Sequence, residues 1–344
     1  MPTNWNNNQS TKSINQNTDN TSHPKPAKKE FSLSDRMDIF IAEDPIKRMD
    51  DLIVSSNVRN QIQTALNRLR FHEVLYNEWN LKKIDPHGNR VALNFFGLPG
   101  TGKSFCAEAI AHCLQLKIIK VNYAEIESKY VGETPKNITA AFLKAKQTNA
   151  VLFFDEADSI LGKRLTNVTQ SADHGVNVSR SVMLLELDKF DGVVIFATNL
   201  AGNYDQAFIR RILSHIEFEL PDRECRIKLW QYLLVAEIPR GNSLTPEWLA
   251  DVSDGLAGGD ILNVVIASAS SAVERIGEER KVLQTDILAE INHLRVSKDK
   301  IGSRPQSNRK VSVTETPIEE LPPDAHQRYN QIISDYDTED LPSS

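Results

Sequence analysis

The sequence has little that would place the protein in or across a membrane. It contains no apolar run near the roughly 20 residues that a spanning helix needs. The opening stretch MPTNWNNNQSTKSINQNTDN has no apolar segment of the kind found in secretory signals. Cys106, Cys113 and Cys225 have neither an even count nor a Cys-x-x-Cys spacing, which argues against a disulfide framework and against a zinc site. We therefore expect a cytoplasmic protein with free thiols and no membrane span.

A surplus of basic charge is also absent. The chain has a net charge of −6, and the segment from Val311 to Ser344 holds eight acidic residues against one base, Arg328. That segment contributes −7, which leaves about +1 for the rest of the chain. A near-neutral body gives no electrostatic reason to expect nucleic-acid binding. The metallopeptidase motif His-Glu-x-x-His is missing too, so any proteolysis would need a separate subunit.

Both ends of the sequence are poor in apolar residues. Residues 1–34 are rich in Asn, Gln, Ser and Thr, and cannot bury enough apolar surface to offset their ordering entropy. Residues 298–344 return to Pro, Ser and acidic residues. We expect a disordered N-terminal tail and a flexible acidic C-terminal tail. The segment RYNQIISDYD within the second tail has the aromatic and aliphatic residues of a short docking helix for an adaptor.

Between these tails, short apolar runs alternate with stretches of helical periodicity. The runs lack the in–out alternation of half-exposed strands, which is typical of parallel strands covered on both faces. The predicted strands are VALNFFGL, LKIIKVN, AVLFFDEAD, GVVIFATN and HIEFEL. The stretches KSFCAEAIAHCLQL and PKNITAAFLKAKQ have apolar residues three and four apart and are predicted crossover helices. The pattern predicts an α/β fold with a doubly wound parallel sheet over 35–222 and a smaller, all-helical domain over 223–297.

The stretch GLPGTGKS, from Gly97 to Ser104, matches the P-loop pattern Gly-x-x-x-x-Gly-Lys-[Ser/Thr] between a predicted strand and a predicted helix. Its glycines let backbone N–H groups surround phosphate oxygens at a helix N-terminus. We expect Lys103 to reach the β- and γ-phosphates of ATP and Ser104 to ligate Mg²⁺. The predicted nucleotide-binding residues here are Gly97, Leu98, Pro99, Gly100, Thr101, Gly102, Lys103, Ser104 and Phe105.

Polar residues also end two other predicted strands. In VLFFDEAD, Asp155 is expected near the metal, and Glu156 is expected to orient and deprotonate an attacking water. In FATN, the amide of Asn199 is suited to hold that water, although an N-cap role is the alternative. Because a nucleotide switch would not need Glu156, the pattern favours hydrolysis over binding alone.

These motifs, followed by AFIRRI and FELPD, resemble in order and spacing the AAA clade of AAA+ ATPases. The resemblance is strongest to single-ring remodelling members: the katanin, spastin and ESCRT-disassembly group and stand-alone bacterial AAA proteins. It covers roughly Asp50 to Val296 and implies a homohexameric ring with ATP sites between subunits and a C-terminal helical lid domain. Arg210 and Arg211 fall on the arginine fingers that reach the γ-phosphate held by a neighbour. A surface ion pair is the alternative for these arginines.

Two further segments are similar to nucleotide-binding parts of the clade. GLAGGDI implies a close approach of Gly258 and Gly259 to the nucleotide, with Asp260 capping the next helix. RMDDLIV implies that residues around the adenine include Asp51, Leu52 and Ile53. Ile53 departs from the usual glycine, and DKF (188–190) departs from the Asp-Gly-Phe that relays nucleotide state between subunits.

The stretch EIESKYVGETPKN resembles the first pore loop of the clade, in which an aromatic and an aliphatic residue precede Gly-Glu. The resemblance implies that Lys129, Tyr130 and Val131 contact a polypeptide substrate on the ring axis. An ordinary exposed tyrosine is the alternative. The polar segment 162–180 is expected to form a second loop on the same channel, with Lys163, Arg164 and His174 either touching substrate or simply solvated.

The sequence and the resemblance together predict a Mg-ATP-hydrolysing ring motor that remodels, unfolds or disassembles proteins. One alternative is an activase-like ATPase that acts on a partner without full threading, and another is a nucleotide-dependent assembly or defence switch. A DNA translocase is disfavoured by the near-neutral body. The expected partners are a protein substrate or assembly, further copies of this chain, and an adaptor on the tails. No folded recruiting module is expected before Asp35.

Overall fold

The structure is a computed structural model, and it describes residues 32–85, 90–123, 125–126, 133–163, 171–199, 202 and 204–302. The chain divides into two compact units, Met1–Ile287 and Leu288–Ser344. The described strands are β1 (Ala42–Glu43), β2 (Val91–Phe96), β3 (Lys117–Asn122), β4 (Ala150–Asp155), β5 (Val193–Thr198) and β6 (Ser214–Glu217). The longer helices are α2 (Ser56–Arg70), α3 (Lys103–Cys113), α5 (Thr134–Thr148), α7 (Ser171–Lys189), α9 (Arg223–Leu233), α11 (Gly258–Val273) and α12 (Gln284–Gly302). The shorter helical segments are α1 (Leu33–Met37), η1 (Glu73–Glu78), η2 (Leu81–Lys83), α6 (Asp158–Leu161), α8 (Gln206–Ile209), α10 (Pro246–Val252) and η3 (Gly277–Glu279).

The six described strands form one sheet in the order β1-β3-β4-β5-β2-β6. All neighbouring pairs are parallel except β1 and β3, which run antiparallel. The five predicted strands are all present, and the prediction of a doubly wound parallel α/β sheet is confirmed. Strand β1 has only two residues and was too short to leave a pattern in the sequence.

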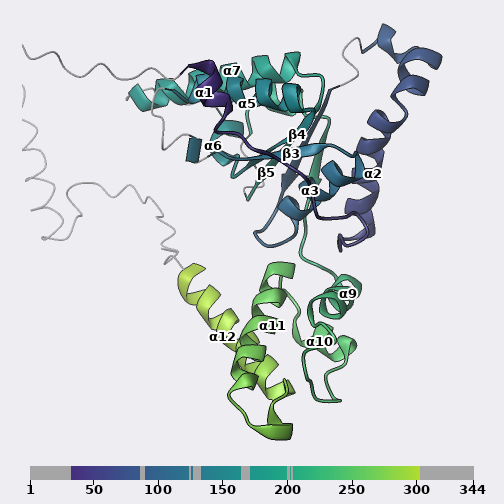
Figure 1. The fold of residues 1–344 in the computed structure, drawn as a ribbon, viewed down its shortest axis with the longest axis vertical. Helices are drawn as coiled ribbons and strands as arrows, with labels where there is room; N and C mark the ends of the chain where they lie inside the picture. The colour runs from purple at the N-terminus through teal and green to yellow at the C-terminus, as the bar shows by residue number, and fades with distance from the viewer. Residues whose placement is uncertain are drawn as a thin grey trace, which may run out of the picture. The chain divides into compact units, whose positions relative to one another are not determined.

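Helices cover both faces of this sheet, which explains why its strands are apolar on both sides. Along β4, Leu152 and Phe154 join the hydrophobic core formed with α1, α5, α6 and α7. The alternate residues Val151 and Phe153 join the core formed with α2 and α3. Figure 1 shows α3 and α2 on one side of the sheet and α5 and α7 on the other. The carboxyl ends of β2, β4 and β5 therefore meet at one edge of a rigid, covered sheet.

The structure corrects the prediction of a polar loop over 162–180. Residues 171–180 are the first half of the helix α7, and Gly175 lies inside that helix. The prediction was wrong because the stretch SADHGVNVSR is mostly polar and contains a glycine, so its few apolar residues do not mark a helix. The second half of α7 is anchored in the core by residues such as Met183. The polar first half extends the same helix toward its N-terminus. Arg180 adds hydrogen bonds from its guanidinium to the backbone of the preceding segment.

The chain beyond the sheet is helical, as predicted. Helix α9 begins after Asp222, whose carboxylate accepts the N–H of Cys225 at 2.8 Å. The structure describes α12 to Gly302, a few residues past the predicted start of the acidic tail. The division into an ATPase domain over 35–222 and a lid over 223–297 stays a prediction. Among the described residues, no helix combines the length and the apolarity that a membrane crossing requires.

Candidate functional site

The turn between β2 and α3 adopts a backbone conformation that requires glycine. The φ angles of Gly97, Gly100 and Gly102 are +136°, +76° and +101°, a region that other residues rarely adopt. A Cβ atom on Gly97 would lie 2.3 Å from the carbonyl oxygen of Phe218. Helix α3 begins at Lys103, directly after the last of these glycines. The unpaired N–H groups of its first turn therefore lie at the end of the loop, where an anion is stabilised.

Lys103 is buried, and its ammonium group is surrounded by oxygen atoms. Its Nζ donates to the carbonyls of Gly97 and Leu98, both at 2.8 Å, and to Oδ1 of Asn199 at 3.0 Å. Burial lowers the pKa of Lys103, while the nearby Asp155 acts in the opposite direction. The structure thus brings the predicted phosphate lysine and the predicted water-binding asparagine into direct contact.

The two predicted metal ligands also meet. The Ser104 hydroxyl, at the start of α3, donates to Oδ2 of Asp155, at the end of β4, over 3.0 Å. Hydroxyl and carboxylate oxygens are the hard ligands that Mg²⁺ prefers, and Mg²⁺ usually binds one or two protein groups together with substrate phosphates and water. The pair fits that requirement.

Glu156 follows Asp155 in a left-handed backbone conformation, with φ of +52°. Such a conformation costs a non-glycine residue about 1–3 kcal/mol and is concentrated at functional sites. The Glu156 side chain is exposed, and its N–H donates to Oδ1 of Asp155 at 2.9 Å. Together with Lys103, Ser104 and Asn199, both acids line one cavity of about 780 Å³. The residues predicted to act on the phosphates therefore share one space.

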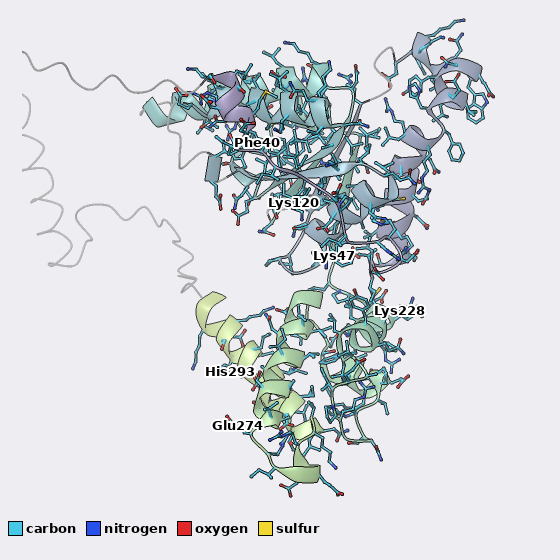
Figure 2. The ribbon with its side chains drawn as sticks, in the orientation of Figure 1. Phe40, Lys47, Lys120, Lys228, Glu274 and His293 are labelled. Atoms are coloured by element: carbon cyan, nitrogen blue, oxygen red, sulfur yellow. The ribbon has the colours of Figure 1, made fainter. Side chains whose placement is uncertain are left out.

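The same cavity extends to residues that the sequence did not single out. It is also lined by Lys47, Lys120 and Asn122, and Figure 2 labels the two lysines. The Lys47 ammonium lies 5.4 Å from the ring centroid of Phe105, within the range of a cation–π contact. Lys47 precedes β2 by more than forty positions, so local sequence gave no signal that it would lie here.

A second cavity, of about 200 Å³, adjoins the P-loop and has a mostly apolar lining. Its walls include all the residues that the resemblance assigned to the adenine and the small domain: Asp51, Leu52, Ile53, Gly258 and Gly259. The remaining predicted residues here are Gly100, Thr101, Gly102 and Phe105. The size and apolarity of this cavity suit a flat base.

Direct contacts join α11 to the P-loop at this second cavity. The Gly259 N–H donates to the Gly100 carbonyl at 3.0 Å, and a Cβ on Gly259 would lie 3.2 Å from the Gly100 Cα. The carboxylate of Asp260 accepts the N–H of Ala257 at 2.8 Å, which confirms its predicted cap. Sequence reasoning missed Leu229 and Tyr232, two wall residues on one face of α9. Leu229 and Tyr232 are three positions apart, which indicated that they share one face of the helix. The sequence did not show that this face would line the cavity.

The arginines predicted as fingers follow the short helix α8. Both are exposed. The Arg211 guanidinium contacts Asp188 of the same chain, with its Nε 3.0 Å and its Nη2 2.9 Å from the carboxylate oxygens. Hydrogen bonds from Arg211, and the charge of Arg90 at 3.2 Å, lower the pKa of Asp188. The ion pair that was the alternative for these arginines is therefore present for Arg211, and the finger role stays a prediction.

The predicted pore loop, with Lys129, Tyr130 and Val131, lies outside the described residues, as does Arg164. Of His174 only the backbone is described, and it lies in α7. Lys163 is exposed, and its carbonyl accepts a hydrogen bond from Arg180 at 2.7 Å. The substrate-contacting roles of these residues stay predictions.

Comparison with known proteins agrees with this geometry. Residues 93–220 match the AAA family, the "ATPase family associated with various cellular activities". A proteasome-activating nucleotidase of Saccharolobus islandicus is 30% identical over 290 residues, which are 78% of this chain and 71% of that protein. A nucleotidase of the same name from Saccharolobus solfataricus is 32% identical, over 63% of this chain and 56% of its own. Spastin of Dictyostelium discoideum is 30% identical, over 58% of this chain and 31% of its own. The chain thus spans about a third of that spastin and a little over half of the Saccharolobus solfataricus nucleotidase.

Proposed function

Because this chain belongs to the AAA family of ATPases, we propose that it hydrolyses Mg-ATP in a ring of identical subunits and uses the energy to remodel, unfold or disassemble proteins. One observation carries the proposal. A single cavity at the edge of the sheet is lined by a buried lysine, a serine–aspartate pair, a second acid and an asparagine: Lys103, Ser104, Asp155, Glu156 and Asn199. Action on proteins is supported by the name of a relative that activates a proteasome.

The positions of these side chains suit separate roles. Lys103, held among oxygen acceptors, can exchange them for phosphate oxygens of ATP. Ser104 and Asp155 would hold Mg²⁺, which neutralises phosphate charge when it is bound with ATP. Glu156 would take the proton of the attacking water, and the amide of Asn199 would orient that water. The purine would occupy the apolar cavity between Ile53 and Gly259.

Completion of the site by a second copy is part of the proposal. Arg210 and Arg211 line a cavity that is separate from the one lined by the P-loop residues of the same chain, so they would act on ATP held by a neighbour. The ion pair that Arg211 makes with Asp188 is partly exposed, and pairs of that kind contribute only about 0–1 kcal/mol. The pair would therefore be exchanged for phosphate at little cost. A homohexamer, a cytoplasmic location and adaptor binding by the tails stay predictions from the sequence.

Substitution of the lysine and of the second acid tests the proposed site. Glu156→Gln keeps the shape of the side chain but removes the base, so ATP affinity should stay near that of the wild type while hydrolysis falls by about 10²-fold or more. Lys103→Ala should abolish ATP binding. Measurement of nucleotide affinity and phosphate release for both variants separates binding from hydrolysis. The matched control is Glu247→Gln on the exposed surface of α10, which should change neither quantity. Wild-type turnover by Glu156→Gln would show that this acid is not the base.

A further inference from the structure

A cluster of polar side chains lies inside the fold where the sheet is otherwise apolar. We call Asn94, Tyr204 and His215 the polar clamp. Asn94 is fully buried on β2 and lies directly opposite His215 of β6 in the parallel register. Asn94 Nδ2 is 3.2 Å from His215 Nδ1. The ring of His215 stacks on that of Tyr204, with 6.1 Å between the ring centroids and 22° between the ring planes. Asn94, which is fully buried, and the partly buried Tyr204 and His215 therefore form one group of side chains.

The polar clamp holds both ends of the segment that carries the two arginines. Tyr204 comes directly before Asp205, whose carboxylate caps α8 by accepting the N–H of Ala207 at 2.8 Å. Arg210 and Arg211 follow α8, and β6 begins three residues later at Ser214, one residue before His215. The segment 205–214 thus leaves the core beside one clamp residue and returns to it beside another.

Hydrogen bonds extend from the polar clamp to the edge of the sheet where the ATP residues lie. The Tyr204 hydroxyl bonds to the side chains of Asn94 and Thr198. The Thr198 hydroxyl donates to the carboxylate of Asp158. Thr198 immediately precedes Asn199, and Asp158 follows Glu156 by two residues. The segment that carries the arginines is therefore connected through side chains to the end of β5 and to α6, the short helix that follows β4.

This arrangement is costly in stability, which argues that it has a purpose other than filling space. Asn94 Oδ1 is buried without a hydrogen-bond partner among the described residues. Unsatisfied buried polar atoms destabilise a fold, and an apolar residue of the same volume at position 94 would avoid that loss. Hydrogen bonds fix the direction and the distance between two groups, whereas apolar contacts do not. The polar clamp therefore restricts the backbone it holds to one position.

We propose that Asn94, Tyr204 and His215 are positioning residues for the arginine fingers. The polar clamp fixes the path of 205–214 so that Arg210 and Arg211 reach the ATP of the neighbouring subunit. None of the three side chains lines either nucleotide cavity, so they act through the arginines. The inference rests on the proposed ATPase ring, because it assigns the arginines to a shared site.

A mixture of two inactive subunits tests the polar clamp. A Lys103→Ala subunit provides fingers but no ATP site, and an Arg211→Ala subunit provides an ATP site but no complete finger pair. Mixed rings then hydrolyse ATP only where the intact P-loop meets the intact fingers. Tyr204→Phe removes one hydroxyl and retains the ring stacked on His215. On the finger-providing subunit it should lower kcat by about fivefold to 10²-fold, the range for two lost hydrogen bonds, with KM for ATP unchanged. On the ATP-providing subunit it should change kcat less than twofold.

Two further variants make the test specific. Asn94→Leu keeps the branched side-chain skeleton and removes both polar atoms, so it should reproduce the loss of kcat seen when Tyr204→Phe is on the finger-providing subunit. The matched control is Tyr76→Phe, which removes a buried hydroxyl bonded to Asp85 at 2.8 Å and should affect both placements alike.

Three results would overturn the inference. Equal loss in both placements of Tyr204→Phe would show that the polar clamp only supports the fold. Unchanged turnover with Tyr204→Phe on the finger-providing subunit, in a mixture that is otherwise active, would remove its positioning role while leaving the shared ATP site intact. Absence of turnover in the mixture that retains Tyr204 would overturn the shared site itself, and the positioning role with it.

Discussion

His215 is the residue whose protonation should most directly affect the buried core. Burial lowers its pKa, against the opposing effect of the Ile209 carbonyl, so the folded protein holds the ring neutral at neutral pH. An unfolded chain binds the proton near its ordinary pKa of about 6.5. The stability associated with the neutral ring is therefore complete above about pH 6.5 and is lost as the pH falls through the folded pKa.

Denaturant unfolding at a series of pH values, on the wild type and His215→Gln, measures this effect. Glutamine is uncharged throughout, so the advantage of the wild type in free energy of unfolding should shrink as the pH falls below about 6.5. A difference that stays constant from pH 8 to pH 5 would show that His215 does not titrate differently in the two states.

The backbone conformation of the P-loop could be predicted from the sequence and the polar clamp could not, for a physical reason. The P-loop is contiguous, and its glycines are needed for positive φ angles that no neighbour outside the loop imposes. Asn94 and His215 meet only because β2 pairs with β6 in one register. Sequence alone predicted both strands but not their pairing. The left-handed backbone conformation of Glu156 could not be predicted either, because no residue in the sequence DEAD (155–158) requires a positive φ angle.

Among the structural elements, the extended segment after β1 shows how one buried acid can hold a connection in place. Glu108, on α3, is 7% exposed and accepts the backbone N–H groups of Ile46 at 2.9 Å and Lys47 at 3.2 Å. Its carboxylate also lies 2.9 Å from Nζ of Lys120 on β3. Burial alone would raise the pKa of Glu108, but these partners lower it. Glu108 therefore links α3, the helix that follows the P-loop, to the segment that leads to the apolar cavity proposed for the purine.

Substitution of this acid should loosen that segment. Glu108→Gln removes the charge that both N–H groups and Lys120 face, so unfolding free energy should fall by about 1–3 kcal/mol and ATP should bind more weakly. Denaturant unfolding and nucleotide titration measure the two effects. The control is Asp44→Asn in the same segment, which removes only an exposed contact to Lys117 at 3.8 Å and should leave both quantities unchanged. Equal effects of the two variants would contradict the role of Glu108.

Among the secondary-structure elements, the strands were predicted correctly from the sequence, whereas the first half of α7 was wrongly predicted to be a loop. The strands are buried on both faces, so their composition alone identifies them. The first half of α7 is polar, and its helical state depends on the packed second half and on Arg180, which donates to backbone carbonyls 2.7 Å away. Such dependence on distant packing leaves no local pattern.

At the scale of the whole molecule, the proposed ATP site of one chain would lack the arginines predicted as its fingers. The P-loop, the metal pair and the acid line one cavity, while Arg211 is occupied by Asp188 elsewhere on the same chain. Two copies in a ring would supply what each lacks. In the proposed ring the predicted pore loops of successive copies, Lys129–Val131, would converge, as the resemblance to ring ATPases implies.

The pore loop therefore gives the prediction that tests the purpose of the assembly. Tyr130→Ala should keep most of the ATPase activity, because its predicted position is apart from the residues that line the phosphate cavity. It should lose protein remodelling, because it removes aromatic area whose burial against a substrate is worth about 1.5–3 kcal/mol per contact. Tyr130→Phe is the matched control and should retain both activities if packing provides the grip. A protein captured by the Glu156→Gln variant serves as substrate in an unfolding or disassembly assay beside the ATPase measurement. Equal loss of both activities in Tyr130→Ala would assign this residue to the fold or the subunit interface, and full remodelling would leave it an ordinary exposed tyrosine.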